Sequence, residues 1–300
     1  MLLAFSHGLL IVLNFNMKMR YILLFVLVSG LISSCKKAAD KISFDKPKRE
    51  YDLAVEGGIN TLTQSQFIRL TKPSLTFDSK PSPISKAAVT VNDGKKDIIF
   101  KETATPGVYA SGSDPKTPNY NMAYTLTIRY HNQTYTAVDT LRQVVNIADD
   151  FLPFRIKKNE AGIYEGTIPK HTFGYLNPNK WWISYPGIPA WNPSRFDGTD
   201  PQSSLYFSYT HFLGSPNSLY PLSNLKRTFS LKSEETITIY KFSLSKEYAK
   251  YLYGVFLETD WNGIFSSVPV NVNGNISGNA QGFFYVTDID FQKYKVNVLK

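Results

Sequence analysis

The side chains that most often carry enzyme chemistry are few and widely spaced in this sequence of 300 residues. Three histidines follow the first thirty-four residues: His131, His171 and His211. None of them stands in the His-Glu-x-x-His spacing of a metal site, and His131 falls in an expected hairpin turn. The sequence contains neither a Gly-x-Ser-x-Gly nucleophile motif nor a Gly-x-x-x-x-Gly-Lys phosphate-binding loop. We interpret the three histidines as structural or exposed side chains.

The carboxylates give no stronger indication of catalysis. Two acidic pairs, Asp149-Asp150 and Glu234-Glu235, are adjacent in sequence, and adjacent side chains of a strand point to opposite faces. The segment from Asp197 to Asp200 contains carboxylates but lacks the spaced ligand series of a calcium loop. We therefore predict no catalytic residues, no metal, no cofactor and no enzymatic activity. A hydrolase whose distant carboxylates meet in the fold is the less favoured alternative.

Aromatic side chains form the best candidate for ligand binding. Trp181, Trp182 and Trp191 are three of the four tryptophans and lie within eleven residues, with Tyr185 between them. Such rings stack on sugar faces and bind apolar ligands, so these four residues are the predicted binding candidates. The alternative is that they cap a hydrophobic core. Because neighbours on a strand point to opposite faces, we expect one of Trp181 and Trp182 to be buried and the other accessible.

The single cysteine, Cys35, is predicted to be modified. A short basic region precedes an apolar run over residues 21–32, and small residues then lead into the cysteine, as in a secretory signal peptide. The sequence Ile-Ser-Ser-Cys is similar to the bacterial lipobox, in which the thiol takes a diacylglyceryl group. We therefore expect residues 1–34 to be removed and Cys35 to be lipidated, with a buried core cysteine as the alternative. The start codon is Met1 or Met17, and the basic residues that follow Met17 favour the second.

The net charge of +9 is concentrated near the N-terminus. Residues 36–50 contain six basic and three acidic side chains, whereas residues 51–300 contain 25 basic and 21 acidic ones. A nucleic-acid-binding protein concentrates its cations on one folded element or face, so we exclude nucleic acid as a partner. We interpret residues 35–50 as a tether between a lipid anchor and the folded part, with its cations near anionic head groups.

Short strands separated by turn residues predict an all-β fold. About seven strands are expected in residues 51–145, which suits an immunoglobulin-like β-sandwich. The clearest pair is 122–130 with 134–138, where alternate residues of the first strand share one face. Residues 146–300 are expected to form a second β-rich domain. One helix is predicted at 245–257, with Ser245 as its N-cap.

Several motifs occur in an order that resembles a known family. They are Ala-Val-Thr-Val-Asn-Asp-Gly at 88–94, Pro-Gly-Val-Tyr at 106–109, Tyr-Thr-Leu-Thr-Ile at 124–128, Asn-Ile-Ser-Gly at 275–278 and Gly-Phe-Phe at 282–284. Together with the lipobox, this order is similar to Bacteroidota lipoproteins catalogued as domain of unknown function 4249. The resemblance implies an outer-membrane location and an accessory role beside a TonB-dependent receptor. It implies no catalytic residues.

These observations lead to one expected function and one alternative from a different class. The first is a non-catalytic, lipid-anchored outer-membrane protein that captures a ligand for a TonB-dependent receptor. The second is a stand-alone surface protein that binds a glycan through the segment from Trp181 to Trp191. The sequence leaves the ligand, the periplasmic or cell-surface face and the oligomeric state open.

Overall fold

The computed structural model describes residues 50–74, 80–113, 117–148, 152–169, 171–173, 178–196, 207–211, 226–259 and 272–299. The predicted signal peptide, Cys35 and nearly all of the tether lie outside these residues, as do Asp149-Asp150 and the segment from Asp197 to Asp200. Within the described part of the chain, no helix has the length and hydrophobicity needed to cross a membrane.

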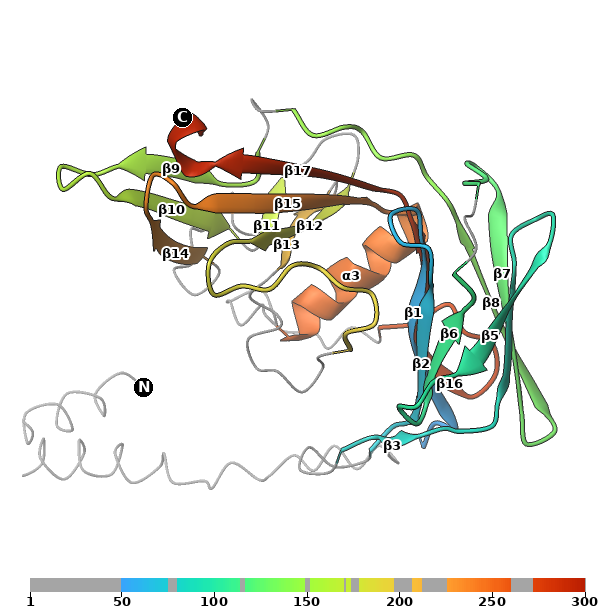
Figure 1. Cartoon of the computed structure of the whole chain (residues 1–300). Helices are drawn as coiled ribbons and strands as arrows, with labels where there is room; N and C mark the ends of the chain where they lie inside the picture. The colour runs from blue at the N-terminus through green and yellow to red at the C-terminus, as the bar shows by residue number, and fades with distance from the viewer. Residues whose placement is uncertain are drawn as a thin grey trace, which may run out of the picture. The chain divides into compact units, whose positions relative to one another are not determined.

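The largest element is a nine-stranded sheet, which we call sheet A. Its strands follow the order β16-β1-β2-β6-β5-β4-β7-β8, and β3 pairs with β2 (Figure 1). The bounds are β1 Leu53–Asn60, β2 Phe67–Lys72, β3 Ser82–Pro83, β4 Ala88–Asn92, β5 Asp97–Glu102, β6 Val108–Ser111, β7 Ala123–Tyr130, β8 Gln133–Thr140 and β16 Ala280–Thr287. All neighbours are antiparallel except β1 and β16, which are parallel.

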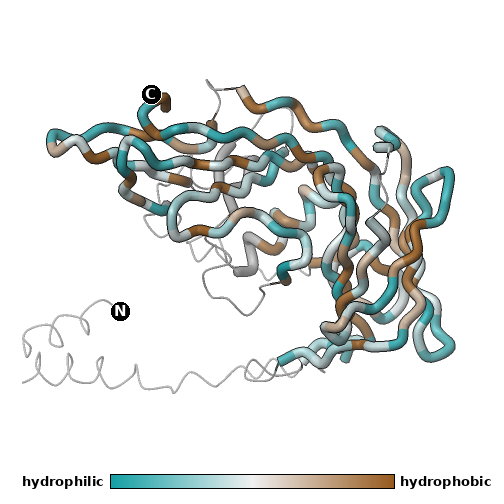
Figure 2. The backbone as a smooth tube through the Cα atoms, in the orientation of Figure 1, coloured by the Kyte–Doolittle hydropathy of each residue, from teal (hydrophilic) through white to brown (hydrophobic). Residues whose placement is uncertain are grey.

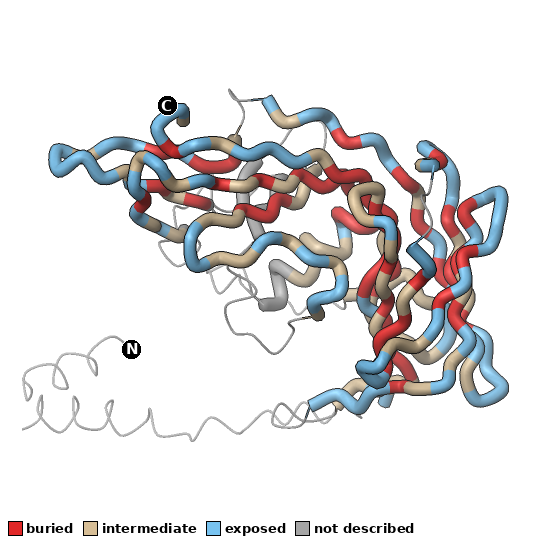
Figure 3. Tube along the Cα trace, viewed as in Figure 1, coloured by how far each residue is buried: buried red, intermediate tan, exposed pale blue. Residues whose placement is uncertain are grey.

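Alternating hydrophobicity explains why these segments form strands with one buried face. In β7, Tyr124, Leu126 and Ile128 are buried, whereas Thr125 and Thr127 are half-buried. Figures 2 and 3 show hydrophobic and buried positions recurring along the strands of sheet A. The inward side chains form one hydrophobic core, to which every strand of sheet A except the short β3 contributes. Strand β6 contributes Tyr109. Burial of this face is what fixes the strand register.

Sheet A is nearly closed, because the segment Asn275–Ser277 fills the gap between its end strands β8 and β16. Asn275 Nδ2 donates to the carbonyl oxygens of Val138 at 3.1 Å and Phe284 at 2.8 Å, and Asn275 Oδ1 accepts from the Phe284 amide at 2.9 Å. The Ser277 amide donates to the Thr136 carbonyl oxygen at 2.8 Å. One asparagine side chain therefore takes the place of a missing backbone partner.

Two smaller sheets come from the second half of the chain. Sheet B has the order β14-β10-β9, and sheet C has the order β11-β13-β12-β15-β17. Their bounds are β9 Arg155–Lys158, β10 Tyr164–Pro169, β11 His171–Phe173, β12 Asn179–Ser184, β13 Phe207–His211, β14 Lys226–Leu231, β15 Thr236–Ser243 and β17 Ile289–Lys295. A second hydrophobic core, which includes Trp181, Ile237 and Ile239, packs residues of both sheets together.

The described residues contain one α-helix, α3 Lys246–Thr259, and a short 3₁₀ turn, η5 Val296–Val298, that follows β17. Ser245 is the N-cap of α3, because Ser245 Oγ accepts from the Tyr248 amide at 3.0 Å. Tyr248 stacks on Phe283 and Tyr285 of β16, with ring centroids 4.9 and 5.0 Å apart. The predicted helix and its cap are therefore confirmed.

The all-β prediction is confirmed, but its finer division is not. The strands of residues 51–145 join one continuous sheet, so the two separate sheets of an immunoglobulin-like sandwich are not confirmed. In addition, β16 belongs to the range predicted as the second domain, yet it pairs with β1 over eight residues from Leu53↔Ala280 to Asn60↔Thr287. The two predicted ranges thus share a sheet. A boundary near residue 145 stays a prediction.

Candidate functional site

The predicted aromatic candidates lie on β12 and the loop that follows it. Trp181 and Trp182 point to opposite faces of sheet C, as their spacing predicts, and join different hydrophobic clusters. Their exposed fractions are only 4% and 5%. The expectation that one of the two rings would be accessible is therefore wrong. Trp182 Nε1 donates to the Pro189 carbonyl oxygen at 2.9 Å, so the polar edge of this ring is also engaged within the protein.

The other two aromatic candidates are half-buried. Tyr185 stacks on Phe229 with ring centroids 4.4 Å apart, and the rings of Trp191 and Phe242 form a T-shaped pair with centroids 5.2 Å apart. Each ring therefore packs on a hydrophobic cluster and still reaches the surface. The structure does not bring all four candidates to one surface. Only Tyr185 and Trp191 retain accessible area for a ligand.

Lys180 precedes this aromatic segment on β12 and lies among aromatic rings of other strands. Its Nζ atom lies 5.7 Å from the Phe242 ring centroid and 6.0 Å from that of Tyr285. Burial among these rings lowers the pKa of Lys180 to about 8, although the Glu56 carboxylate opposes this shift. Burial also raises the pKa of Tyr285. Aromatic faces stabilise a cation in such a setting, which accounts for a lysine at this position without assigning it a reaction.

Of the three histidines only His131, and of the two acidic pairs only Glu234-Glu235, have side chains that the structure describes. In the described part of the chain, no group of three or more His, Cys, Asp or Glu side chains could hold a metal ion. His171 and His211 lie in β11 and β13, but their side chains are outside what the structure describes. Glu234 and Glu235 lie in the turn before β15, where Glu235 Oε2 accepts from the Lys232 amide at 2.8 Å.

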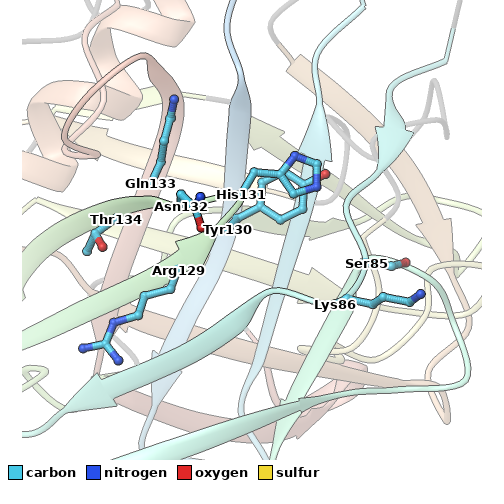
Figure 4. A pocket seen from close by; sticks show the side chains of 8 residues that line it. All are labelled: Ser85, Lys86, Arg129, Tyr130, His131, Asn132, Gln133 and Thr134. Atoms are coloured by element: carbon cyan, nitrogen blue, oxygen red, sulfur yellow. The ribbon is translucent and has the colours of Figure 1, made fainter.

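An open pocket of about 510 Å³ lies at the β7–β8 hairpin, and we call it the hairpin pocket. It is lined by Ser85, Lys86 and the continuous stretch 129–134 (Figure 4). The hairpin turn consists of His131 and Asn132, which have φ values of 46° and 60°. A two-residue turn with both φ values positive matches the twist of its flanking strands. The turn thus carries the His131 side chain to the end of sheet A.

The hairpin pocket has an aromatic centre between two cations. The rings of Tyr130 and His131 stack with centroids 4.0 Å apart and an interplanar angle of 15°. In Figure 4, Lys86 lies on one side of this stacked pair and Arg129 on the other. Both cations are exposed, and neither forms an ion pair with another described residue. No carboxylate is among the residues that line the pocket.

The segment that carries Lys86 is held by two side chains of the sheet. Glu102 Oε2 accepts from the Lys86 amide at 3.0 Å, and Glu102 Oε1 accepts from the Gly107 amide at 2.9 Å. The bonds from Gly107, Ser85 and Lys86 lower the pKa of Glu102, so this carboxylate stays charged near neutral pH. The buried Tyr109 donates through its hydroxyl group to the Ile84 carbonyl oxygen at 2.8 Å and accepts from the Ala87 amide at 3.0 Å.

Sequence reasoning placed His131 in a turn but did not find the hairpin pocket. The pair His131-Asn132 between two strands was a usable signal, because histidine and asparagine are enriched at positive φ. Lys86 gave no such signal, since it is brought to the pocket by the pairing of Ala88 with Arg129 across β4 and β7. The pocket therefore depends on strand register, which the local sequence does not reveal.

The described residues form a β-rich protein with a polar pocket at one end of its largest sheet. The family model described as Domain of unknown function (DUF4249) matches residues 39–292, and the chain belongs to this family. A search of the curated proteins found no match.

Proposed function

We propose that this protein is a lipid-anchored outer-membrane protein that captures a ligand and passes it to a TonB-dependent receptor. The observation that supports the capture role is the hairpin pocket, which is open, polar and held in shape by Glu102 and Tyr109. Pockets of this size accommodate small ligands, and preorganised sites lose less entropy on binding.

The anchor is proposed from the sequence around Cys35. The order of a basic region, an apolar run, small residues and one cysteine is typical of exported lipoproteins. The strand pairings place the start of β1 and the β7–β8 hairpin at the same end of sheet A. The tether therefore joins the folded part at the end of the sheet that carries the pocket.

Co-purification tests the accessory role. The tagged full-length chain is expressed in the cell that encodes it, cross-linked, and captured from detergent-solubilised membranes. We expect a TonB-dependent receptor to accompany the wild-type chain, and the Cys35→Ala variant to recover less of it because the variant is no longer held at the membrane. Absence of any such receptor from the wild-type capture would contradict the proposal.

A stand-alone glycan-binding protein is the second candidate, and the half-buried Tyr185 and Trp191 favour it. Trp191→Phe keeps a ring, whereas Trp191→Ala removes it. If the aromatic segment binds glycans, Trp191→Ala lowers binding on a glycan array and Trp191→Phe retains it. Equal binding by both variants would remove the support for this candidate.

A further inference from the structure

The charge and polarity of the hairpin pocket point to an anionic ligand. Lys86 and Arg129 are its charged residues, and its other side chains are hydroxyl, amide, phenol and imidazole groups. The charged Glu102 interacts electrostatically with Lys86, but it accepts from the Lys86 and Gly107 amides and does not line the pocket. Because cations that lack an ion-pair partner favour anions, the pocket is suited to a ligand that carries negative charge.

The stacked pair of Tyr130 and His131 separates the two cations. Figure 4 shows the two rings one over the other, with Lys86 and Arg129 extending on opposite sides. His131 is exposed, so its outer ring face is open to a ligand. Because the two cations extend on opposite sides of the rings, the arrangement fits an extended ligand with a ring at its centre and charges on both sides.

Backbone conformation is also unusual at this place. Four non-glycine residues among the described ones have positive φ, and three of them, Lys86, His131 and Asn132, line the hairpin pocket. The turn geometry accounts for His131 and Asn132. Lys86, at φ 63°, is not part of that turn and is held in this conformation by the bonds from its segment to Glu102 and Tyr109. Such conformations are retained where the surrounding structure enforces them, commonly at binding sites.

We propose that the hairpin pocket binds an acidic oligosaccharide, one that carries carboxylate or sulfate groups on successive sugars. The sugar face stacks on His131, Lys86 and Arg129 bind anionic groups on either side, and the amides of Asn132 and Gln133 serve the hydroxyl groups. The pocket lining contains no aliphatic side chain, so it offers nothing to the acyl chains of a lipid. This inference names the ligand class for the capture role and rests on that proposed function.

Calorimetric titration of the full-length chain in detergent tests the ligand class. The probes are tetragalacturonate, a sulfated galactose tetrasaccharide, neutral galactotetraose and inorganic phosphate, each at low and high salt. We expect both charged oligosaccharides to bind at least about tenfold more tightly than galactotetraose at low salt, and to lose affinity as salt screens the cations. Equal affinity for the charged and neutral probes would overturn the proposal. Complete competition by millimolar phosphate would do the same, because it would indicate a site for a single anion.

Matched variants tie the binding to the pocket. Lys86→Gln and Arg129→Gln are each expected to weaken the binding of tetragalacturonate about tenfold. The controls Lys96→Gln and Arg155→Gln remove exposed cations that do not line the pocket and are expected to leave the affinity unchanged. His131→Phe keeps a ring for stacking and retains binding, whereas His131→Ala loses it. Unchanged unfolding temperatures show that each variant is folded. Equal affinities in all variants would overturn the proposal.

Two further measurements distinguish the proposed glycan ligand from a lipid surface and from the accessory role beside a receptor. Co-sedimentation with phosphatidylglycerol vesicles that depends on Lys86 and Arg129, combined with no binding of the charged oligosaccharides, would replace the glycan with a lipid surface. If receptor co-purification succeeds and no charged oligosaccharide binds, the ligand class is wrong and the accessory role stands. If the oligosaccharide binds and no receptor co-purifies, the accessory role fails and the ligand class stands.

Discussion

The carboxylate of Asp139 accepts a hydrogen bond from the backbone amide of Val286 at 2.8 Å, and this bond joins β8 to β16. The two residues are 147 positions apart in the sequence and lie at the seam where sheet A nearly closes. Asp139 is 3% exposed, so its charge is carried at a buried position. The seam therefore couples the closure of the sheet to the ionisation of one carboxyl group.

The pH dependence of stability should reveal this coupling. Burial raises the pKa of Asp139 from 3.8 to about 6, although hydrogen bonds from Ser245 and the Val286 and Thr140 amides oppose the shift. Because the folded state binds this proton more tightly than the unfolded state, ionisation costs stability. The cost is absent below about pH 4, grows as the pH rises to 6, and reaches about 3 kcal/mol above it.

Asp139→Asn isolates this contribution, since the amide oxygen can still accept from Val286. Urea unfolding of both proteins between pH 4 and 7.5 gives the difference in their free energies of unfolding. We expect this difference to shift in favour of the variant as the pH rises, by about 3 kcal/mol over the range. A difference that is constant with pH would refute the assignment.

Asn275 should be important for stability because its side chain replaces a strand at the same seam. Asn275→Ala removes three hydrogen bonds and leaves the amide and carbonyl groups of Phe284 without these partners. We expect a loss of about 2–3 kcal/mol in the free energy of unfolding. Asn297→Ala, at an exposed position in η5, is the control and should change stability by less than about 0.5 kcal/mol. Equal effects would contradict the role of Asn275.

The parallel pairing of β1 with β16 requires glycine at position 282. Gly282 has a φ of +94°, and a Cβ atom there would lie 2.0 Å from the Val55 carbonyl oxygen. Gly187 is a matched control, because its φ of +90° is similar but a Cβ atom would meet nothing within 4 Å. Gly187→Ala should cost about 1 kcal/mol from backbone strain alone.

Gly282→Ala adds the steric clash and should cost more than about 3 kcal/mol, with low soluble expression as the extreme outcome. The unfolding temperatures and soluble yields of Gly187→Ala and Gly282→Ala are compared. Similar unfolding temperatures for the two alanine variants would show that β1 and β16 are not paired as described.

Burial should determine how the tryptophans respond to substitution. Trp182→Phe removes the hydrogen bond to Pro189 and leaves a small cavity, so we expect a loss of about 2 kcal/mol. Trp191→Phe, at a half-buried ring, should cost less than about 1 kcal/mol. Chemical unfolding measures both. A larger loss for Trp191→Phe would contradict the packing of β12 and its following loop.

Local sequence patterns predicted the elements better than their assembly. The β7–β8 hairpin and helix α3 were predicted because alternation, turn residues and an N-cap serine act within a few residues. Strands β10 and β14 were not predicted. The pairing of β1 with β16 was also missed, because a parallel pair needs a long connection and leaves no local signal.

For the candidate sites too, the sequence predicted local features better than features that depend on tertiary packing. The adjacent tryptophans were predicted to face opposite sides of a strand, and they do, but their burial depends on two different hydrophobic clusters formed by other elements. Lys86 reaches the hairpin pocket only through the register of β4 against β7. Side-chain type and spacing therefore predicted direction along a strand, whereas accessibility depended on tertiary packing.

Lipidation of Cys35 is the central claim that can be measured most directly. Cells that express the tagged chain are grown with an alkyne-labelled palmitate, and the captured protein is examined for the label and for the mass of its N-terminal peptide. The account predicts label on the wild-type chain, a mature N-terminus at a lipid-modified Cys35, and no label on Cys35→Ala. A wild-type chain that carries no label, or that keeps residues before Cys35, would contradict it.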